Sequence, residues 1–440
     1  MKNLCLLYLL LFPLVLSAKD NKSWSAKTEN ANYIHRAIKQ ITDVMVHDIY
    51  SPPVAARTYA YTCIAGYEAA VAGNPNYKTF AGRLHGLKAL PKPKTGKDYS
   101  YTIAAVHAIF TVGKTMVVSE DKIDAFSSGM TKEFKESEIP LEVYNNSVLF
   151  GQAIAKHIIA WAALDNYKQT RTFSKYSVTN DAASWKPTPP AYFKAVEPHW
   201  NKIRTFLIDS AQQFKPAPAT PFSIEKSSSF YKEALSVRDT GLNLSAEQKE
   251  IANFWDCNPF RMNINGHVMY ASKKISPGGH WMNITMLACK KTSANVARSL
   301  DAYACAAITI ADAFISCWDE KYRSNVIRPE TYINRYIDQR WTPLLQTPPF
   351  PEYTSGHSVI SASSAIMLEN IFGKNFSYED STEVEFGLPV RQFTSFLQAA
   401  QEAAISRFYG GIHYMPAIVN GVEEGKRIGT FMVKKLMNRK

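Results

Sequence analysis

The chain has 440 residues, of which 46% are hydrophobic and 20% charged, so its composition excludes a disordered or collagen-like protein and predicts a globular one. Lys and Arg outnumber Asp and Glu by 50 to 38, which gives a formal net charge of +12 and suits an anionic substrate. The basic residues form no run of five or more and no recognition motif with aromatic residues, so we expect no nucleic-acid partner.

The N-terminus is typical of a secretory signal peptide. Lys2 precedes an apolar stretch from Leu4 to Leu16, and the small residues Ser17 and Ala18 follow. We expect a signal peptide over residues 1–18 and export to the periplasm or the exterior, with an uncleaved anchor as the alternative. No later segment offers a long uninterrupted apolar run, so we expect no integral membrane span in the mature chain.

Helical periodicity dominates the rest of the chain. Ile34, Ile38, Ile41 and Met45 follow one another at steps of three and four residues. Similar apolar stripes cover 54–72, 101–117, 141–163, 244–255, 292–317, 357–372, 390–408 and 417–437. Strand-like alternation is scarce, so the sequence predicts an all-α fold of bundled helices. We expect residues 19–440 to form a single large domain, with the active-site core in about 290–440.

Long proline-punctuated stretches connect the expected helices, at 85–98, 172–200, 213–223 and 342–354. Such segments in a compact helical protein tend to be functional or to wrap the surface. The cysteines that follow the signal peptide are odd in number and contain no CxxC pair. We therefore expect buried free thiols rather than a disulfide framework or a zinc site, although one or two bridges stay possible.

The first segment whose side chains could take part in binding or catalysis runs from Lys321 to Pro329. Its two cations, Lys321 and Arg328, are seven residues apart, which in a helix is close to two turns and puts both on one face. Pro329 is expected to mark the end of that helix. Taken alone, the pair is equally compatible with a solvated helix face.

The second segment is the proline-rich approach to His357. An apolar helical pattern begins at Val359, directly after Ser355 and Gly356. A serine at a helix start leaves free backbone N–H groups and the positive end of the helix dipole facing whatever binds there. Ser355 and Gly356 are therefore candidate anion-binding residues, although a serine N-cap is common in any helix.

The third segment closes another helical pattern with Ser406, Arg407 and, six residues after the arginine, His413. Arginine supplies a planar fork of donors that suits a tetrahedral oxyanion, and histidine can serve as a ligand or a nucleophile. Either residue alone would more often be structural, so the interpretation depends on all three segments occurring together.

Together and in this order, the three segments resemble the signature of the vanadium-dependent haloperoxidase and type 2 phosphatidic acid phosphatase superfamily, most closely that of bacterial vanadium haloperoxidases. The signature is Lys, six residues, Arg-Pro; then Pro-Ser-Gly-His; then Ser-Arg, five residues, His. Thr354 departs from it where the pattern has proline. Ala417 departs from it where the family often has an aspartate that orients the histidine at position 413. The resemblance implies helical bundles of that superfamily's type.

The resemblance also implies vanadate, as V(V), for a cofactor and hydrogen peroxide and a halide for substrates. His413 would coordinate the metal, and the oxyanion would be bound by Lys321, Arg328, Ser355, Gly356 and Arg407. His357 and Lys321 would be the catalytic pair, with His357 accepting a proton from hydrogen peroxide and Lys321 polarising the bound peroxide. Attack by iodide or bromide would then give a hypohalous-acid equivalent.

Two other functions stay open for the same residues. In an acid phosphatase of the superfamily, which needs no cofactor, His413 would attack phosphorus of a phosphate monoester and His357 would protonate the leaving alcohol. An inactive homologue would bind the oxyanion and turn nothing over. The length of the chain, its lack of membrane spans and the absence of the aspartate at Ala417 favour the peroxidase. Nothing in the sequence indicates an organic acceptor or an oligomeric state.

Three further residues are candidates by their place in the resemblance. Trp318 and Phe350 fall where the family has aromatic groups on the halide side, although both could simply pack. Asp256 could be the upstream acid that supports His357, or it could cap a turn.

Overall fold

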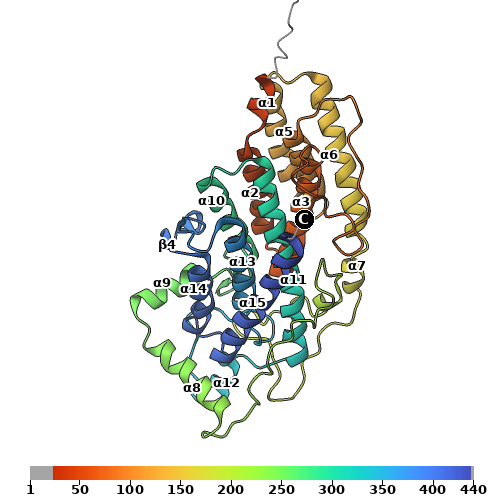
Figure 1. Cartoon of the computed structure of the whole chain (residues 1–440). Helices are drawn as coiled ribbons and strands as arrows, with labels where there is room; N and C mark the ends of the chain where they lie inside the picture. The colour runs from red at the N-terminus through yellow and green to blue at the C-terminus, as the bar shows by residue number, and fades with distance from the viewer. Residues whose placement is uncertain (1–22, 438–440) are drawn as a thin grey trace, which may run out of the picture.

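The computed structural model describes residues 23–437, and every structural statement below concerns that part of the chain. The predicted signal peptide over residues 1–18 lies outside the described residues. The fold is all-α, as predicted, with only two short two-stranded antiparallel sheets (Figure 1).

The helices are α1 (Ser23–Thr28), α2 (Ala31–His47), α3 (Pro52–Val71), α4 (Tyr101–Lys114), α5 (Glu120–Glu136), α6 (Leu141–Ala162), α7 (Tyr167–Thr170), α8 (Ser229–Leu242), α9 (Ala246–Phe254), α10 (Pro277–Lys291), α11 (Val296–Ser324), α12 (Pro329–Tyr336), α13 (Gly356–Phe372), α14 (Phe396–Tyr409) and α15 (Met415–Met437). Two short 3-10 helices are η1 (Trp200–Lys202) and η2 (Val384–Phe386). The strands are β1 (Met262–Asn265), β2 (Val268–Ala271), β3 (Tyr378–Asp380) and β4 (Arg391–Phe393). Strand β1 pairs with β2 and β3 with β4.

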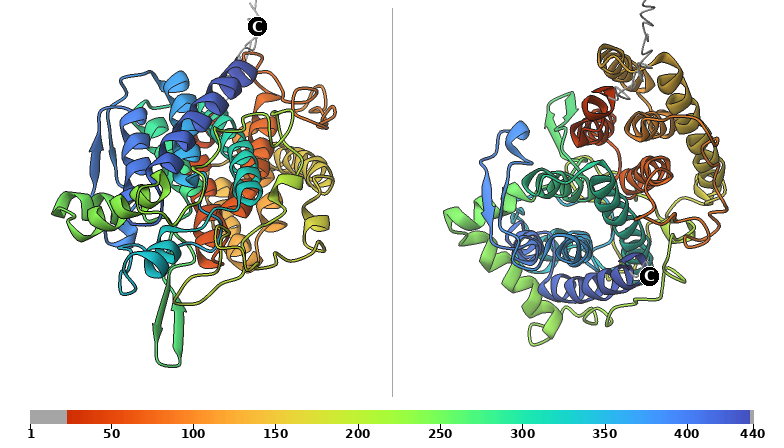
Figure 2. Two further views of the ribbon diagram at one scale, coloured as in Figure 1. Left: turned by 90° about the horizontal axis from the view of Figure 1, so that it is seen from below. Right: turned by 45° about the horizontal axis from the view of Figure 1, so that its top comes forward.

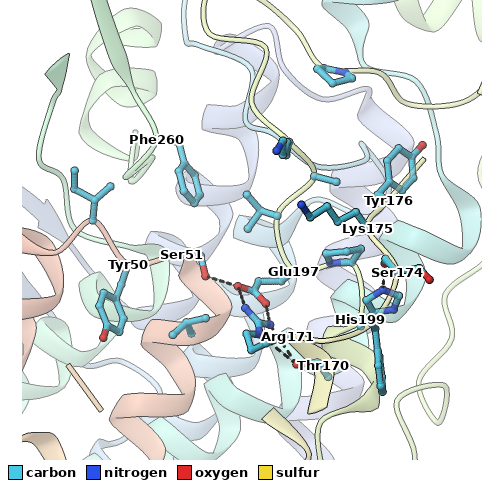
Figure 3. Close-up of a pocket in the computed structure, with 18 of the residues that line it drawn as sticks. Tyr50, Ser51, Thr170, Arg171, Ser174, Lys175, Tyr176, Glu197, His199 and Phe260 are labelled. Carbon is cyan, nitrogen blue, oxygen red and sulfur yellow. Dashed lines mark hydrogen bonds and ion pairs between the residues drawn. The ribbon is translucent and has the colours of Figure 1, made fainter. Parts of the chain in front are cut away.

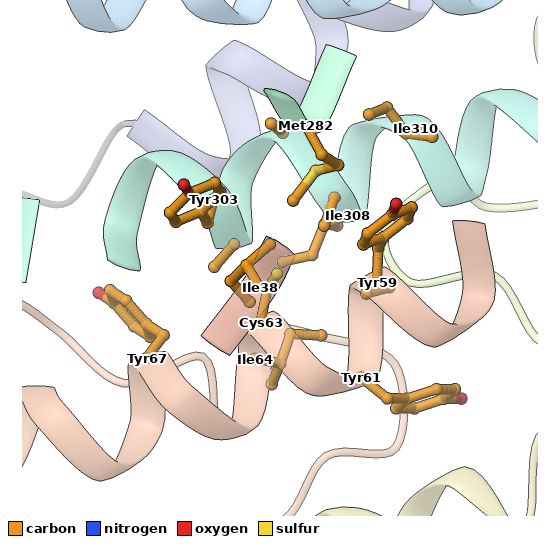
Figure 4. Packing of buried hydrophobic residues seen from close by; sticks show 14 of the residues in the cluster. Ile38, Tyr59, Tyr61, Cys63, Ile64, Tyr67, Met282, Tyr303, Ile308 and Ile310 are labelled. Carbon is orange, nitrogen blue, oxygen red and sulfur yellow. The ribbon is translucent and has the colours of Figure 1, made fainter. Parts of the chain in front are cut away.

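Helix α11 is the centre of the molecule. It packs against α3 on the N-terminal side and against α13 and α15 on the C-terminal side (Figure 2). One hydrophobic cluster runs from α2 through α11 to α15, and Tyr59, Cys63 and Ile308 lie in its interior between α3 and α11 (Figure 4). Of the described helices, α11 alone has the length and apolarity to cross a membrane, and it is fully enclosed by the protein.

Two details of the helix predictions were wrong. Residues 390–408 were expected to be one helix, but β4 occupies Arg391–Phe393 and α14 begins only at Phe396. Lys321 and Arg328 do not share a helix face, because α11 ends at Ser324, where the left-handed backbone of Asn325 stops it. Proline suits the first turn of a helix, and Pro329 accordingly begins α12 rather than ending α11.

Helices α5 and α8 were missed because each buries only a thin apolar stripe. Helix α5 buries Ile123, Met130 and Phe134, and α8 buries Phe230, Ala234 and Val237. So few apolar positions give a weak periodic signal. The expectation of free thiols agrees with the structure, since the cysteines within residues 23–437 are all buried and unbridged.

Candidate active site

The three sequence segments meet at one buried place. Arg328 caps the start of α12, Gly356 and His357 begin α13, Arg407 lies in the last turn of α14, and His413 lies between α14 and α15. Gly356, His357, Arg407 and His413 line a common cavity with Trp318 and Phe350. The juxtaposition predicted from sequence is therefore present, although these residues come from four separate elements.

His413 is held between a carboxylate and a guanidinium. Its Nδ1 lies 2.7 Å from Oε1 of Glu352, and its Nε2 lies 3.1 Å from Nη1 of Arg328. Burial and the charge of Arg328 keep the pKa of His413 well below its usual range, so the ring is neutral at pH 7. A neutral ring that donates from Nδ1 to Glu352 has its lone pair on Nε2, which is the form that binds a metal.

Glu352 supplies the acid that the sequence lacks at Ala417. Its Oε1 also accepts a hydrogen bond from the backbone N–H of Tyr414 at 3.0 Å, so one oxygen holds both His413 and the chain beside it. Burial raises the pKa of Glu352 to about 7, and the neighbouring charges of Arg328 and Lys321 oppose that shift. The departure at Ala417 therefore leaves the orientation of His413 intact.

Several buried nitrogen atoms at or beside the cavity have no partner within the described chain. They are Nη2 of Arg328, Nε of Arg407 and Nε2 of His357. Arg328 donates from Nε and Nη1 to the carbonyls of Phe350 and Ile412, and Arg407 donates from Nη1 to the carbonyl of Trp255. Buried polar groups without partners are rare in folded proteins, and a set of them converging on one cavity is the arrangement expected of an anion site.

His357 is partly buried, and its ring is neutral at pH 7. Burial, helped by the positive charge of Arg407, holds its pKa well below the usual range, and a hydrogen bond to the main chain of Trp255 opposes this only in part. Its Nε2 faces no partner among the described residues. A neutral imidazole with one unpartnered nitrogen at a cavity can accept a proton from a small acid.

Lys321 is buried but does not line the cavity, because its ammonium is already occupied. Nζ donates to the carbonyls of Pro351, Glu352 and Thr354 at 3.1, 3.2 and 2.5 Å. Burial lowers its pKa to about 8. In this structure Lys321 fixes the turn before α13 and adds positive charge nearby.

Only some of the groups at the start of α13 are available for the anion binding expected of Ser355 and Gly356. The backbone N–H of Ser355 donates to the carbonyl of Ala417 at 3.1 Å, and the Ser355 side chain caps the helix by accepting from the N–H of Ser358. The Ser355 hydroxyl proton and the first N–H of the helix, at Gly356, are the groups that this end of the helix offers to a ligand.

Trp318 and Phe350 lie together at the cavity, as predicted. Their ring centroids are 5.0 Å apart, and the Phe350 ring also lies under the Arg328 guanidinium at 5.2 Å. The two rings therefore form an apolar wall beside the cationic groups, which excludes water from that side of the cavity.

Of the two roles left open for Asp256, support of His357 is not seen, because the two side chains form no hydrogen bond or ion pair in the described chain. The carboxylate of Asp256 binds Nζ of Lys274 at 2.8 Å and Nη1 of Arg261 at 3.3 Å. Its charge also favours the ionised form of Arg407, opposing the lowering of the pKa of Arg407 by burial. A buried carboxylate takes cationic partners in preference to a neutral imidazole, and that is why the structure pairs Asp256 with lysine and arginine.

Thr354 and Glu424 form a buried pair that the sequence did not reveal. The Thr354 hydroxyl donates to Oε2 of Glu424 at 2.8 Å, and the Ser316 hydroxyl donates to Oε1 at 2.8 Å. Because the carbonyl of Thr354 accepts from Lys321, the pair ties α15 to the turn that begins α13. Thr354 is thus anchored by its side chain at the position where the family signature has proline.

The pair predicts a pH dependence of stability. Burial raises the pKa of Glu424 from the ordinary 4.5 to about 7, so the folded protein binds a proton at this site that the unfolded chain releases. The contribution of Glu424 to the free energy of unfolding is full below pH 4.5 and is lost as the pH rises toward 7. Urea unfolding of vanadate-free protein should therefore show the wild type losing about 2 kcal/mol relative to Glu424→Gln between pH 5 and pH 7.5. Parallel pH profiles for the two proteins would contradict this.

Sequence reasoning missed Glu352, although one signal was available. Glu352 is the lone acid in a run of proline and aromatic residues directly before the Ser355 turn. A carboxylate in so apolar a context needs a buried partner, and that partner proves to be His413. Trp255 accepts a hydrogen bond from Arg407 through its main-chain carbonyl. A main-chain contact of this kind cannot be predicted from the type of side chain.

Fold and site together define a helical protein with a buried, cationic oxyanion cavity. A family model described as the VCPO second helical-bundle domain matches residues 301–439. The crystal structure described as the first bacterial vanadium-dependent iodoperoxidase is 49% identical, with a TM-score of 0.88 over 92% of this chain and 97% of that one.

More distant similarity extends to a bacterial vanadium-dependent chloroperoxidase. Its holo form is 15% identical with a TM-score of 0.66, covering 89% of this chain and 95% of the other. Its apo form is 16% identical with a TM-score of 0.68, covering 88% and 95%. No curated protein sequence matches the chain. The chain belongs to the vanadium-dependent haloperoxidase family, and it is an enzyme of that family.

Proposed function

We propose that this enzyme oxidises iodide, and bromide less readily, with hydrogen peroxide to a hypohalous-acid equivalent. The observation that carries the proposal is a set of buried nitrogen atoms without partners in the described chain, namely Nε of Arg407 and Nε2 of His357, whose residues line the cavity, and Nη2 of Arg328 beside His413. The similarity to the iodoperoxidase at 49% identity supports iodide as the first substrate to test.

The residues present fit vanadate. Arg328 and Arg407 would hold its oxygens, and Nε2 of His413, which the Glu352 hydrogen bond leaves with its lone pair, would be its nitrogen ligand. When bound, vanadate would supply Lewis-acid activation of hydrogen peroxide toward attack by halide.

The chain's own residues would do the remaining work. His357, neutral and with Nε2 free, would take a proton from hydrogen peroxide. Trp318 and Phe350 exclude water and give a large, weakly hydrated anion such as iodide an apolar approach beside positive charge. Lys321 keeps the α13 turn in place through three carbonyls, and it would polarise the substrate only by leaving at least one of them.

The test is a vanadate-reconstitution assay. Purified protein dialysed against orthovanadate should form triiodide from iodide and hydrogen peroxide, and should do so more slowly with bromide replacing iodide in a bromination readout. The same protein without vanadate is the control. No triiodide from loaded protein, alongside brisk hydrolysis of p-nitrophenyl phosphate by unloaded protein, would overturn the proposal.

A phosphatase is the second candidate, and Glu352 is the observation in its favour. A carboxylate on Nδ1 of His413 would orient that ring for attack on phosphorus as well as for coordination. The absence of an aspartate at Ala417 therefore no longer weighs against this function. Binding of phosphate without either reaction would instead identify an inactive oxyanion-binding homologue.

Export also stays a proposal, because it depends on the sequence of residues 1–18 alone. The support is the apolar stretch between Lys2 and the small residues Ser17 and Ala18. Intact-mass analysis of the protein from its native cells should give an N-terminus at Ala18 or Lys19. An N-terminus at Met1 would favour the uncleaved alternative.

A further inference from the structure

A second, larger cavity lies beside the candidate active site and opens to solvent. It has a volume of about 750 Å³ and lies between the end of α2 and the long segment 170–199 (Figure 3). We call it the outer cleft. Its walls are rich in aromatic side chains, namely Tyr50, Tyr167, Phe173, Tyr176, Tyr192 and Phe260. Two of these side chains are exposed to solvent, Tyr192 to 63% and Phe173 to 40%.

The outer cleft adjoins the active-site cavity directly. Phe260 lines both cavities. Val196, which lines the outer cleft, accepts a hydrogen bond from Nε1 of Trp318 at 3.2 Å and donates its N–H to the carbonyl of Pro349 at 3.0 Å. The outer cleft and the active-site cavity therefore share Phe260 as a lining residue, and Val196 connects the wall of the cleft to Trp318.

The side chains that line the outer cleft carry a net positive charge, because Arg171, Lys175 and Lys194 outnumber Asp48 and Glu197. Lys175 and Lys194 are exposed and form no hydrogen bond or ion pair with another residue in 23–437. Glu197 pairs with Arg171, whereas Asp48 accepts from uncharged donors at Val118 and Ser119. Figure 3 shows Lys175 extending into the cavity, with Tyr176 beside it and Phe260 across from it. An apolar aromatic wall with free ammonium groups complements an aromatic anion.

We propose that the outer cleft binds a phenolic carboxylate as the organic acceptor of the hypohalous acid. The inference rests on the proposed haloperoxidase function, because that reaction supplies the electrophile. The ring carbon of the acceptor forms a bond to iodine of hypoiodous acid and loses its hydrogen as a proton, which leaves with the hydroxide of hypoiodous acid as water. The aromatic residues hold the ring, and Lys175 and Lys194 hold the carboxylate.

The test is a competition between a charged and a neutral acceptor. Vanadate-loaded enzyme is given iodide, hydrogen peroxide and equal amounts of 4-hydroxybenzoate and 4-hydroxybenzyl alcohol, and the two iodinated products are measured by chromatography. Hypoiodous acid added without enzyme gives the reference ratio. The enzyme should favour the benzoate by about fivefold over that reference, and Lys175→Ala/Lys194→Ala should return to it. The product ratio is internal, so it does not depend on how fast each variant turns over.

Lys226→Ala, an exposed lysine outside the outer cleft, is the matched control and should keep the wild-type ratio. Calorimetric titration of vanadate-free protein with 4-hydroxybenzoate is the second readout, and the double variant should bind it more weakly than the wild type. Triiodide formation together with the reference ratio in the wild type would overturn the inference and leave the proposed function standing. Absence of triiodide would overturn the proposed function, and the titration would then show independently whether the cleft takes an aromatic anion.

Discussion

His413→Ala abolishes the retention of vanadate and, with it, halide oxidation. The substitution removes the imidazole whose orientation a buried carboxylate fixes at the cavity, with Nδ1 on Glu352 and Nε2 toward Arg328. Vanadium that stays with the protein after gel filtration, measured by elemental analysis, should fall to background in the variant.

His357→Ala separates binding from turnover. It should keep the bound anion, since Arg328, Arg407 and His413 remain, and should lose about 100-fold or more in rate because the proton acceptor is gone. His107→Ala removes a partly buried histidine of α4 that does not line the cavity, and it serves as the folding control. Equal loss of vanadate in the His357 and His413 variants would contradict the division of roles.

Glu352→Ala should weaken vanadate binding by about 10- to 100-fold, the usual effect of removing the partner that orients a ligating histidine. Without the carboxylate, His413 loses the hydrogen bond at Nδ1, and the tautomer with a free Nε2 is no longer favoured. Fluorescence or equilibrium dialysis with orthovanadate measures the change in dissociation constant.

Glu352→Gln is the informative companion, because its amide oxygen can still accept from Nδ1 of His413. It should retain more affinity than the alanine variant. Glu423→Ala, an exposed acid that pairs with Lys426, controls for the loss of one negative charge. Wild-type affinity in Glu352→Ala would show that the hydrogen bond seen in the structure does not orient the ligand.

Much of the fold follows from patterns that sequence alone displays. Helices with wide apolar stripes, such as α3, α11 and α15, were predictable because their periodicity spans many turns. Helices α5 and α8 were not, since each buries a few residues only. The end of α11 was misplaced because the left-handed residue Asn325 that stops it carries a weaker signal than Pro329.

Some residues of the candidate site were also predictable from sequence, and others were not. Arg328, His357, Arg407 and His413 were identifiable because their spacing repeats a family signature, and the structure does bring them together. The partner of His413 was sought at a fixed interval after it, whereas Glu352 arrives from a loop 61 residues earlier. A hydrogen bond between distant segments depends on tertiary packing, and a single sequence does not display it.

In the proposed mechanism, His413 is the nitrogen ligand of a vanadate held by Arg328 and Arg407. X-ray absorption at the vanadium edge of the loaded protein examines that ligand shell. We expect one nitrogen donor among oxygens in the wild type and no vanadium signal retained by His413→Ala. A shell made only of oxygen in the wild type, or an unchanged spectrum in the variant, would contradict it.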